Sequence, residues 1–322
     1  METFESNKYN CTPDTLKSTL ETYGVAVIPS VLDEYECESM YQGFWNYFTH
    51  ISRDWDKPIK RNDTTTWKEM YRLIPQHGML LQHFEIGHAQ HIWNIRQNPN
   101  VVEPFAKLWK CDKRDLLVSF DGAGFGMAPE LTGRGWFRKS WFHTDQSFTR
   151  NDFECVQSWV TALDVKQGDA SLAFYEGSHK YHKEFASVFK KNDKRDWCKL
   201  NDEEEQFFVE KGCAIKRISC PKGSMVFWDS RTLHHGSEPL KGRTGLRNRA
   251  VAYVCYQPRK HATKKQIDKK QKAFANRRTC SHWPTKTKLF GKHPQTYGKP
   301  LPPVRPLSEP TLSDLGRRLA GF

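Results

Sequence analysis

The chain has 322 residues, of which 37% are hydrophobic and 13% aromatic, so it can bury a sizeable core and is not an intrinsically disordered protein. It contains no apolar run of about 18 residues that could span a bilayer. The first twenty residues lack the basic-then-apolar order of a signal peptide, so we expect a soluble, cytoplasmic protein. The nine cysteines are scattered and form no CxxC pair, which favours reduced thiols over disulfides or a zinc site.

The net charge of +13 is concentrated at one end of the chain. Residues 259–322 carry 16 Lys and Arg against three acidic residues, whereas residues 1–258 are neutral overall. We therefore expect a globular domain over 1–258 and a basic, partly helical, Pro-rich C-terminal extension over 259–322. Part of the extension is expected to pack back on the domain and bury Trp283 of the "HWP" motif, while the lysines between Lys264 and Lys272 stay in water. Such a segment suits contact with nucleic acid or an acidic partner and would fit a nuclear location, although a solvated charged face explains it more simply.

The first third of the chain predicts one strand followed by helices. The β-branched run from Val25 to Ile28 reads as a strand, and apolar residues from Tyr35 to Phe48 then recur at helical spacing. Residues 51–80 are polar and irregular. "NPNVVEPFAKLW" predicts a helix that begins near Pro99, and "DLLVSF" predicts the next strand.

The middle of the chain predicts a series of short strands. The segments are "CVQSWVTALDV", "ASLAFYEG", "CAIKRISC", "GSMVFWD" and "RAVAYVCYQ", separated by Gly, Asp and Asn. Helical insertions are expected around 179–212, including a helix capped by Asn201. This order predicts a mainly β protein with a double-stranded β-helix (jelly-roll, cupin-like) core and flanking helices.

The stretch "WFHTDQSF", residues 141–148, places His143 and Asp145 two residues apart. On a strand, side chains at this spacing point to the same side of the sheet. One imidazole nitrogen and one carboxylate oxygen would then converge, which supplies two of the three ligands of the 2-His-1-carboxylate facial triad found in non-haem Fe(II) oxygenases. Trp141, Phe142, Phe148 and Trp159 are candidates for the pocket wall, although aromatic residues at strand spacing are more often plain core.

The third ligand is expected in "WDSRTLHHGSEP", where His234 and His235 follow a predicted strand. Neighbours on a strand face opposite ways, so only one of the two can reach the metal, and the spacing alone leaves both open. The pairs His83/Glu85 and His182/Glu184 share the His-x-acid spacing. They lie in a predicted loop or helix, where residues two apart do not face each other.

Arg247 and Arg249 begin the strand that follows these histidines. An arginine here suits a dicarboxylate co-substrate, because the planar guanidinium can bind a carboxylate through two parallel hydrogen bonds. This chemistry points to 2-oxoglutarate. Solvent-exposed arginines in a loop are the alternative interpretation.

These motifs, in this order, resemble the phytanoyl-CoA dioxygenase family of Fe(II)/2-oxoglutarate-dependent oxygenases over about residues 20–258. The resemblance implies His143, Asp145 and His235 as metal ligands, since "HGS" is similar to the family's distal His-x-Ser motif. It further implies Ser237 and Arg249 as 2-oxoglutarate contacts, with Arg247 as the reserve and Trp159 near the same site. The family's substrates are diverse, so the resemblance does not identify the substrate.

The resemblance implies a dioxygenase that uses Fe(II), 2-oxoglutarate and O₂ and releases succinate and CO₂. Because Asp145 is retained where related halogenases leave room for chloride, hydroxylation of an organic substrate is the expected reaction. The alternative is a catalytically silent jelly-roll protein that binds nucleic acid or another polyanion through its basic C-terminal segment.

Overall fold

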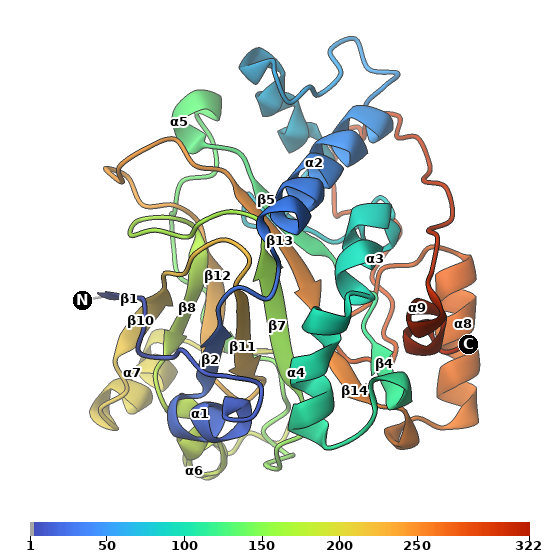
Figure 1. Ribbon diagram of the computed structural model, residues 1–322. Coiled ribbons are helices and arrows are strands. Elements are labelled where there is room, and N and C mark those ends of the chain that lie inside the picture. The colour runs from blue at the N-terminus through green and yellow to red at the C-terminus, as the bar shows by residue number, and fades with distance from the viewer. Residues whose placement is uncertain (1–2) are drawn as a thin grey trace.

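Two six-stranded sheets form the centre of the computed structural model, which describes residues 3–322 (Figure 1). The first sheet has the order β1 (Thr3–Glu5), β10 (Ile215–Ile218), β8 (Ser171–Tyr175), β12 (His234–Ser237), β6 (His143–Thr144) and β9 (Cys198–Lys199). The second has the order β2 (Val25–Ile28), β11 (Met225–Asp229), β7 (Val156–Thr161), β13 (Arg249–Val254), β5 (Ala123–Gly126) and β3 (Leu80–Leu81). A separate pair joins β4 (Leu116–Val118) to β14 (Tyr256–Pro258). The sheets do not close into a barrel, and the predicted mainly β, cupin-like fold with flanking helices is confirmed.

Side-chain alternation explains how the second sheet is buried on both faces. Val25 and Val27 of β2 belong to the cluster between the two sheets, together with Phe174 of β8, whereas Ala26 and Ile28 face the helices. The helices on that outer face are α1 (Leu16–Tyr23), α2 (Glu34–Ile51), α3 (Gln90–Arg96) and α4 (Pro99–Trp109). Strands covered on both sides read as continuous apolar runs, which is why the sequence signal for them is strong.

The remaining short helices lie in the connections between strands. They are α5 (Pro129–Thr132), α6 (His182–Val188) and α7 (Asp202–Glu210), with 3₁₀ helices at Thr64–Leu73, Ile86–His88, Lys113–Asp115 and Ser178–Tyr181. A further 3₁₀ helix, Arg259–His261, follows the last strand. The predicted cap of α7 is present, because the Asn201 side chain accepts a hydrogen bond of 2.9 Å from the backbone N–H of Glu204. The insertions expected around 179–212 are therefore helical.

The C-terminal segment packs against the rest of the chain. It contains α8 (Lys264–Ala275) and α9 (Asp314–Ala320), which lie side by side at the edge of the molecule in Figure 1. Phe274 and Leu319 belong to the same hydrophobic cluster as α2 and α4. Trp283 is buried, as its "HWP" motif predicted. Residues 259–322 thus share the main core instead of extending away from it.

One expectation about this segment was wrong. The lysines of α8 were expected to remain in water, but Lys270 is buried, and its ammonium group donates hydrogen bonds to the carbonyl oxygens of Val118 and Pro284. The ammonium nitrogen also lies 3.9 Å from the centroid of the Phe120 ring. Burial lowers the Lys270 pKa to about 8. The exposed lysines of α8 are Lys264, Lys265, Lys269 and Lys272.

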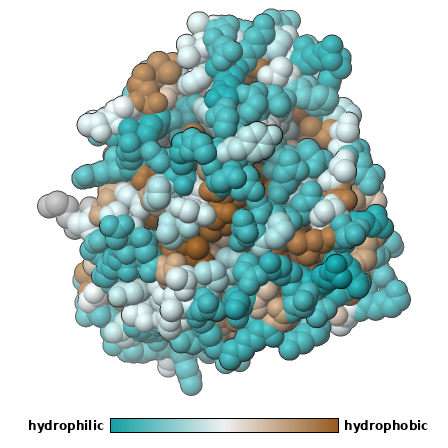
Figure 2. Space-filling model, in the orientation of Figure 1, coloured by the Kyte–Doolittle hydropathy of each residue, from teal (hydrophilic) through white to brown (hydrophobic). Residues whose placement is uncertain are grey.

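The outer surface agrees with this packing. On the face drawn in Figure 2 most of the surface is hydrophilic, and hydrophobic atoms gather in small, separate groups. Within residues 3–322, no helix has the length and hydropathy needed to cross a membrane. All nine cysteines are free thiols, as predicted.

Candidate metal centre

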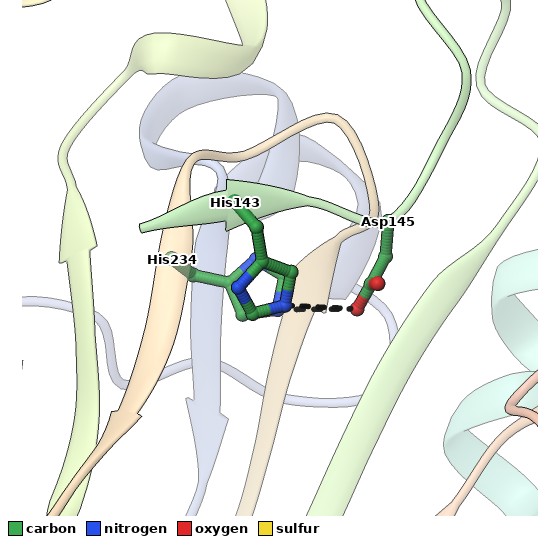
Figure 3. Close-up of side chains that lie close together, drawn as sticks. All are labelled: His143, Asp145 and His234. Atoms are coloured by element: carbon green, nitrogen blue, oxygen red, sulfur yellow. Dashed lines mark ion pairs between the residues drawn. The ribbon is translucent and has the colours of Figure 1, made fainter. Parts of the chain in front are cut away.

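His143, Asp145 and His234 meet on the cavity side of the first sheet (Figure 3). His143 in β6 is the register partner of His234 in β12, and the backbone N–H of Asp145 donates to the carbonyl of Ser230 at 2.9 Å. The cross-strand pairing sets the two imidazoles beside each other, with ring centroids 4.5 Å apart. The sheet therefore positions all three side chains.

The three ligand atoms are close enough to share one ion. Asp145 Oδ2 lies 3.6 Å from His143 Nε2 and 3.4 Å from His234 Nε2, and one ligand atom from each residue lies within 4.8 Å of the others. Two imidazoles and one carboxylate form the ligand set of the facial triad, which leaves coordination positions open for a co-substrate and O₂. The structure brings His143 and Asp145 together as the sequence predicted.

His234, and not His235, completes this group. The two residues alternate on β12, so His235 points away from the cavity, where its ring packs edge-on against Phe142 at 4.5 Å between centroids. Its side chain is fully buried, and burial lowers its pKa to about 3. The assignment of His235 as a ligand is thus contradicted by the geometry. Matching "HGS" to a family motif was wrong by one residue, which on a strand changes the face.

Backbone hydrogen bonds orient both imidazoles. His143 Nδ1 lies 3.1 Å from the carbonyl oxygen of Trp141, and His234 Nδ1 lies 2.8 Å from that of Thr232. A carbonyl can only accept, so each Nδ1 carries the proton and each Nε2 keeps its lone pair for a metal. Trp141 also stacks on His143, with centroids 4.7 Å apart and planes inclined by 9°. The hydrogen bonds and the stacking therefore fix the direction in which both Nε2 atoms point.

Gln157 holds the carboxylate and was missed by the sequence reasoning. Its amide Nε2 donates to Asp145 Oδ2 at 3.0 Å. Burial opposes ionisation of Asp145, but His143 and His282 nearby hold its pKa well below the usual value, so it is an anion at neutral pH. A polar residue within the apolar strand "CVQSWV" was the signal that could have identified Gln157.

The metal ligands line a cavity of about 680 Å³, and Arg249 and Trp159 line it as well. Arg249 is buried, and its NH1 donates to the carbonyl of Ala170 at 2.9 Å. Its Nε is buried without a hydrogen-bond partner, while the guanidinium carbon lies 5.2 Å from the centroid of the Trp159 ring. A buried guanidinium with an unused N–H is suited to an anionic ligand in this cavity.

The structure places the other candidate co-substrate residues away from this cavity. Arg247 forms an ion pair with Asp169, with Nε–Oδ2 at 2.6 Å and NH2–Oδ1 at 3.0 Å. Ser237 lies on the same face of β12 as His235, and its hydroxyl donates to the carbonyl of Glu238. Neither lines the metal cavity. The predicted 2-oxoglutarate contact of Ser237 is therefore contradicted by its direction on the strand.

Of the four predicted wall residues, Trp141 and Trp159 line the cavity, whereas Phe142 and Phe148 belong to a separate hydrophobic cluster behind the sheet. Among the described residues, neither of the two decoy pairs joins the group of His143, Asp145 and His234; Glu85 pairs instead with Arg277, and Glu184 with Lys211.

The fold and this site define a non-haem iron oxygenase. The family model "Phytanoyl-CoA dioxygenase (PhyH)" matches residues 20–244. The chain belongs to this family, whose members are Fe(II)/2-oxoglutarate-dependent oxygenases, and the resemblance seen in the sequence is confirmed.

Two relatives and one solved structure give the extent of the similarity. The "Ava biosynthesis cluster protein O" of Aspergillus versicolor is 26% identical over 250 residues, covering 74% of this chain and 78% of the relative. A "Putative phytanoyl-CoA dioxygenase" of Dictyostelium discoideum is 27% identical over 257 residues, covering 67% and 68%. The structure titled "Putative Oxidoreductase" from Salmonella typhimurium LT2 has a TM-score of 0.55 at 11% identity and covers 95% of this chain and 82% of that one, which supports the fold alone.

Proposed function

We propose that the protein hydroxylates an organic substrate, with His143, Asp145 and His234 as Fe(II) ligands and Arg249 as the residue that binds 2-oxoglutarate. The observation that carries the proposal is the common cavity: three converging ligand atoms and a buried, incompletely paired guanidinium line the same space. The reaction converts substrate, 2-oxoglutarate and O₂ into hydroxylated product, succinate and CO₂. When bound, the iron and 2-oxoglutarate supply the oxidising chemistry.

The protein's own residues orient these groups. The Nδ1–H groups of His143 and His234 donate to backbone carbonyls, which fixes both Nε2 lone pairs toward the ion. Gln157 fixes the carboxylate of Asp145. Arg249 attracts the distal carboxylate of the co-substrate, and Tyr253 lies near enough to the guanidinium to act as a further donor. The carboxylate ligand is the reason for favouring hydroxylation, because it leaves no ligand position for a halide.

The experiment is a 2-oxoglutarate turnover assay with Fe(II) and ascorbate under air. We expect the wild-type chain to release succinate and Asp145→Ala to release none. When the substrate is found, product formed under ¹⁸O₂ should gain one labelled oxygen atom. Equal succinate release by Asp145→Ala would rule out the assigned site, and a product without labelled oxygen would rule out hydroxylation.

A further inference from the structure

The C-terminal segment supplies one wall of the metal cavity. From beyond residue 244, where the family match ends, the cavity lining includes Arg249, Tyr253 and a stretch from Ser281 to Gln295 that contains His282, Trp283, Lys286 and Lys288. The family match ends at residue 244, while the metal ligands lie at or before residue 234. This part of the cavity lining therefore comes from a segment of the chain that lies outside the family match.

His282 presents an unused hydrogen-bonding atom in this wall. Its Nε2 is buried and has no partner within the described residues, although the side chain lines the cavity. A buried imidazole nitrogen left unpaired is costly, so a ligand atom that bonds to it would be stabilised.

Five tryptophans line the cavity. Trp141, Trp159, Trp228 and Trp283 line the cavity and are held in place by their neighbours, whereas Trp197 is 53% exposed. The Trp197 ring lies 5.8 Å from the ring of the metal ligand His143, centroid to centroid. A large aromatic face left in water beside a metal ligand can gain stability when a flat apolar group covers it.

We propose that the substrate is a planar, aromatic molecule with a hydrogen-bonding polar group such as a ring amide. The aromatic part would stack on Trp197, and the polar group would bond to His282. This assignment rests on the proposed function, because it places the substrate beside the proposed iron centre. His282 and Trp197 are then specificity-determining residues, which the family motifs alone would not reveal.

The test uses three small probes with the full chain loaded with Mn(II) and 2-oxoglutarate in the absence of oxygen. The probes are 2-quinolinone, naphthalene and the saturated bicyclic lactam that corresponds to 2-quinolinone. Mn(II) increases the proton relaxation rate of a probe bound close to it, so this measurement reports both the dissociation constant and the location. We expect 2-quinolinone to bind about tenfold more tightly than the saturated lactam, because only the flat ring stacks.

The variants separate the two contacts. His282→Ala should weaken 2-quinolinone about fivefold to tenfold, as expected for one lost hydrogen bond, and should change naphthalene less than about twofold. His282→Gln should restore part of this loss. Trp197→Ala should weaken both flat probes by about tenfold. His261→Ala is the matched control, since His261 is an exposed histidine of the same segment outside the cavity.

Three results would overturn the inference: equal binding of the flat and saturated lactams, no probe binding near Mn(II), or a His282→Ala effect that is the same for both flat probes. The last would mean that His282 only supports the wall. Wild-type protein that fails to bind Mn(II) and 2-oxoglutarate would instead contradict the proposed function. The two failures are therefore distinguishable.

Discussion

The exchange of roles between His234 and His235 gives the sharpest test of the site. His234→Ala removes one of three ligands, so we expect metal affinity to fall by on the order of 100-fold or more, beyond the effect of losing an outer-shell partner. His235→Ala removes a fully buried ring that packs against Phe142 and leaves a cavity. That change should cost about 2–4 kcal/mol of folding free energy and leave the ligands in place.

The assay is chemical unfolding with and without Mn(II), because the metal-induced increment separates binding from stability. A metal at about 100 times its dissociation constant stabilises the native state by about 2.7 kcal/mol. Wild type and His235→Ala should both show this metal-induced increment. The free energy of unfolding without metal should be lower for His235→Ala than for wild type. His234→Ala should show almost none, although its metal-free stability changes less than that of His235→Ala.

The opposite pattern would refute the reasoning. If His235→Ala lost the increment and His234→Ala kept it, the strand would have to present the other histidine to the cavity, and the register between β12 and β6 would be wrong. A loss in both variants would indicate that disruption of β12 itself abolishes binding. His235→Phe then decides between these cases, because it refills the core without offering a ligand.

Three further predictions concern other parts of the molecule. Arg249→Lys should weaken 2-oxoglutarate by roughly tenfold or more, measured by calorimetry, while Arg247→Lys changes it less than about twofold; an effect confined to Arg247 would move the role to that residue. Burial lowers the pKa of His88 and of His91 to about 3, so unfolding takes up protons below pH 6.5. Each histidine should then lower the free energy of unfolding by about 1.4 kcal/mol per pH unit as the pH falls from about 6 toward 4. A midpoint of urea unfolding that does not change over that pH range would contradict this. If the exposed lysines of residues 264–272 bind phosphate backbones, DNA or RNA retention should fall steeply from about 50 to 200 mM salt, and no retention at low salt would exclude the polyanion hypothesis.

The C-terminal segment shows how a charge pattern can mislead. Its composition predicted a basic extension beyond a domain that ends at residue 258, and every predicted metal ligand lies within that domain. Charge counts include every lysine, but they do not show that the aliphatic part of Lys270 packs inside or that Trp283 faces the metal cavity. Removing 259–322 would take away core residues as well as a cavity wall, so we now expect such a truncation to fail to fold.

Local patterns in the sequence determined much of the fold and two of the three metal ligands. Apolar runs predicted β2 and β11, because both faces of these strands are buried. The strand β7 was predicted as well, although Gln157 and Ser158 interrupt its apolar run. His143 and Asp145 follow from a spacing of two, which is a property of the chain alone.

Only the tertiary structure decided which neighbour of a pair faces the cavity. The register of β12 against β6 and β8 turns His234 inward and His235 and Ser237 outward. That register depends on contacts between distant segments, since His234 pairs with His143, 91 residues away, and with Phe174, 60 residues away. Tertiary packing also brings Gln157, Trp197 and His282 to the site, because these residues come from distant parts of the chain. Sequence spacing determines whether two nearby side chains on a strand point the same way. Burial and packing determine which distant segments meet.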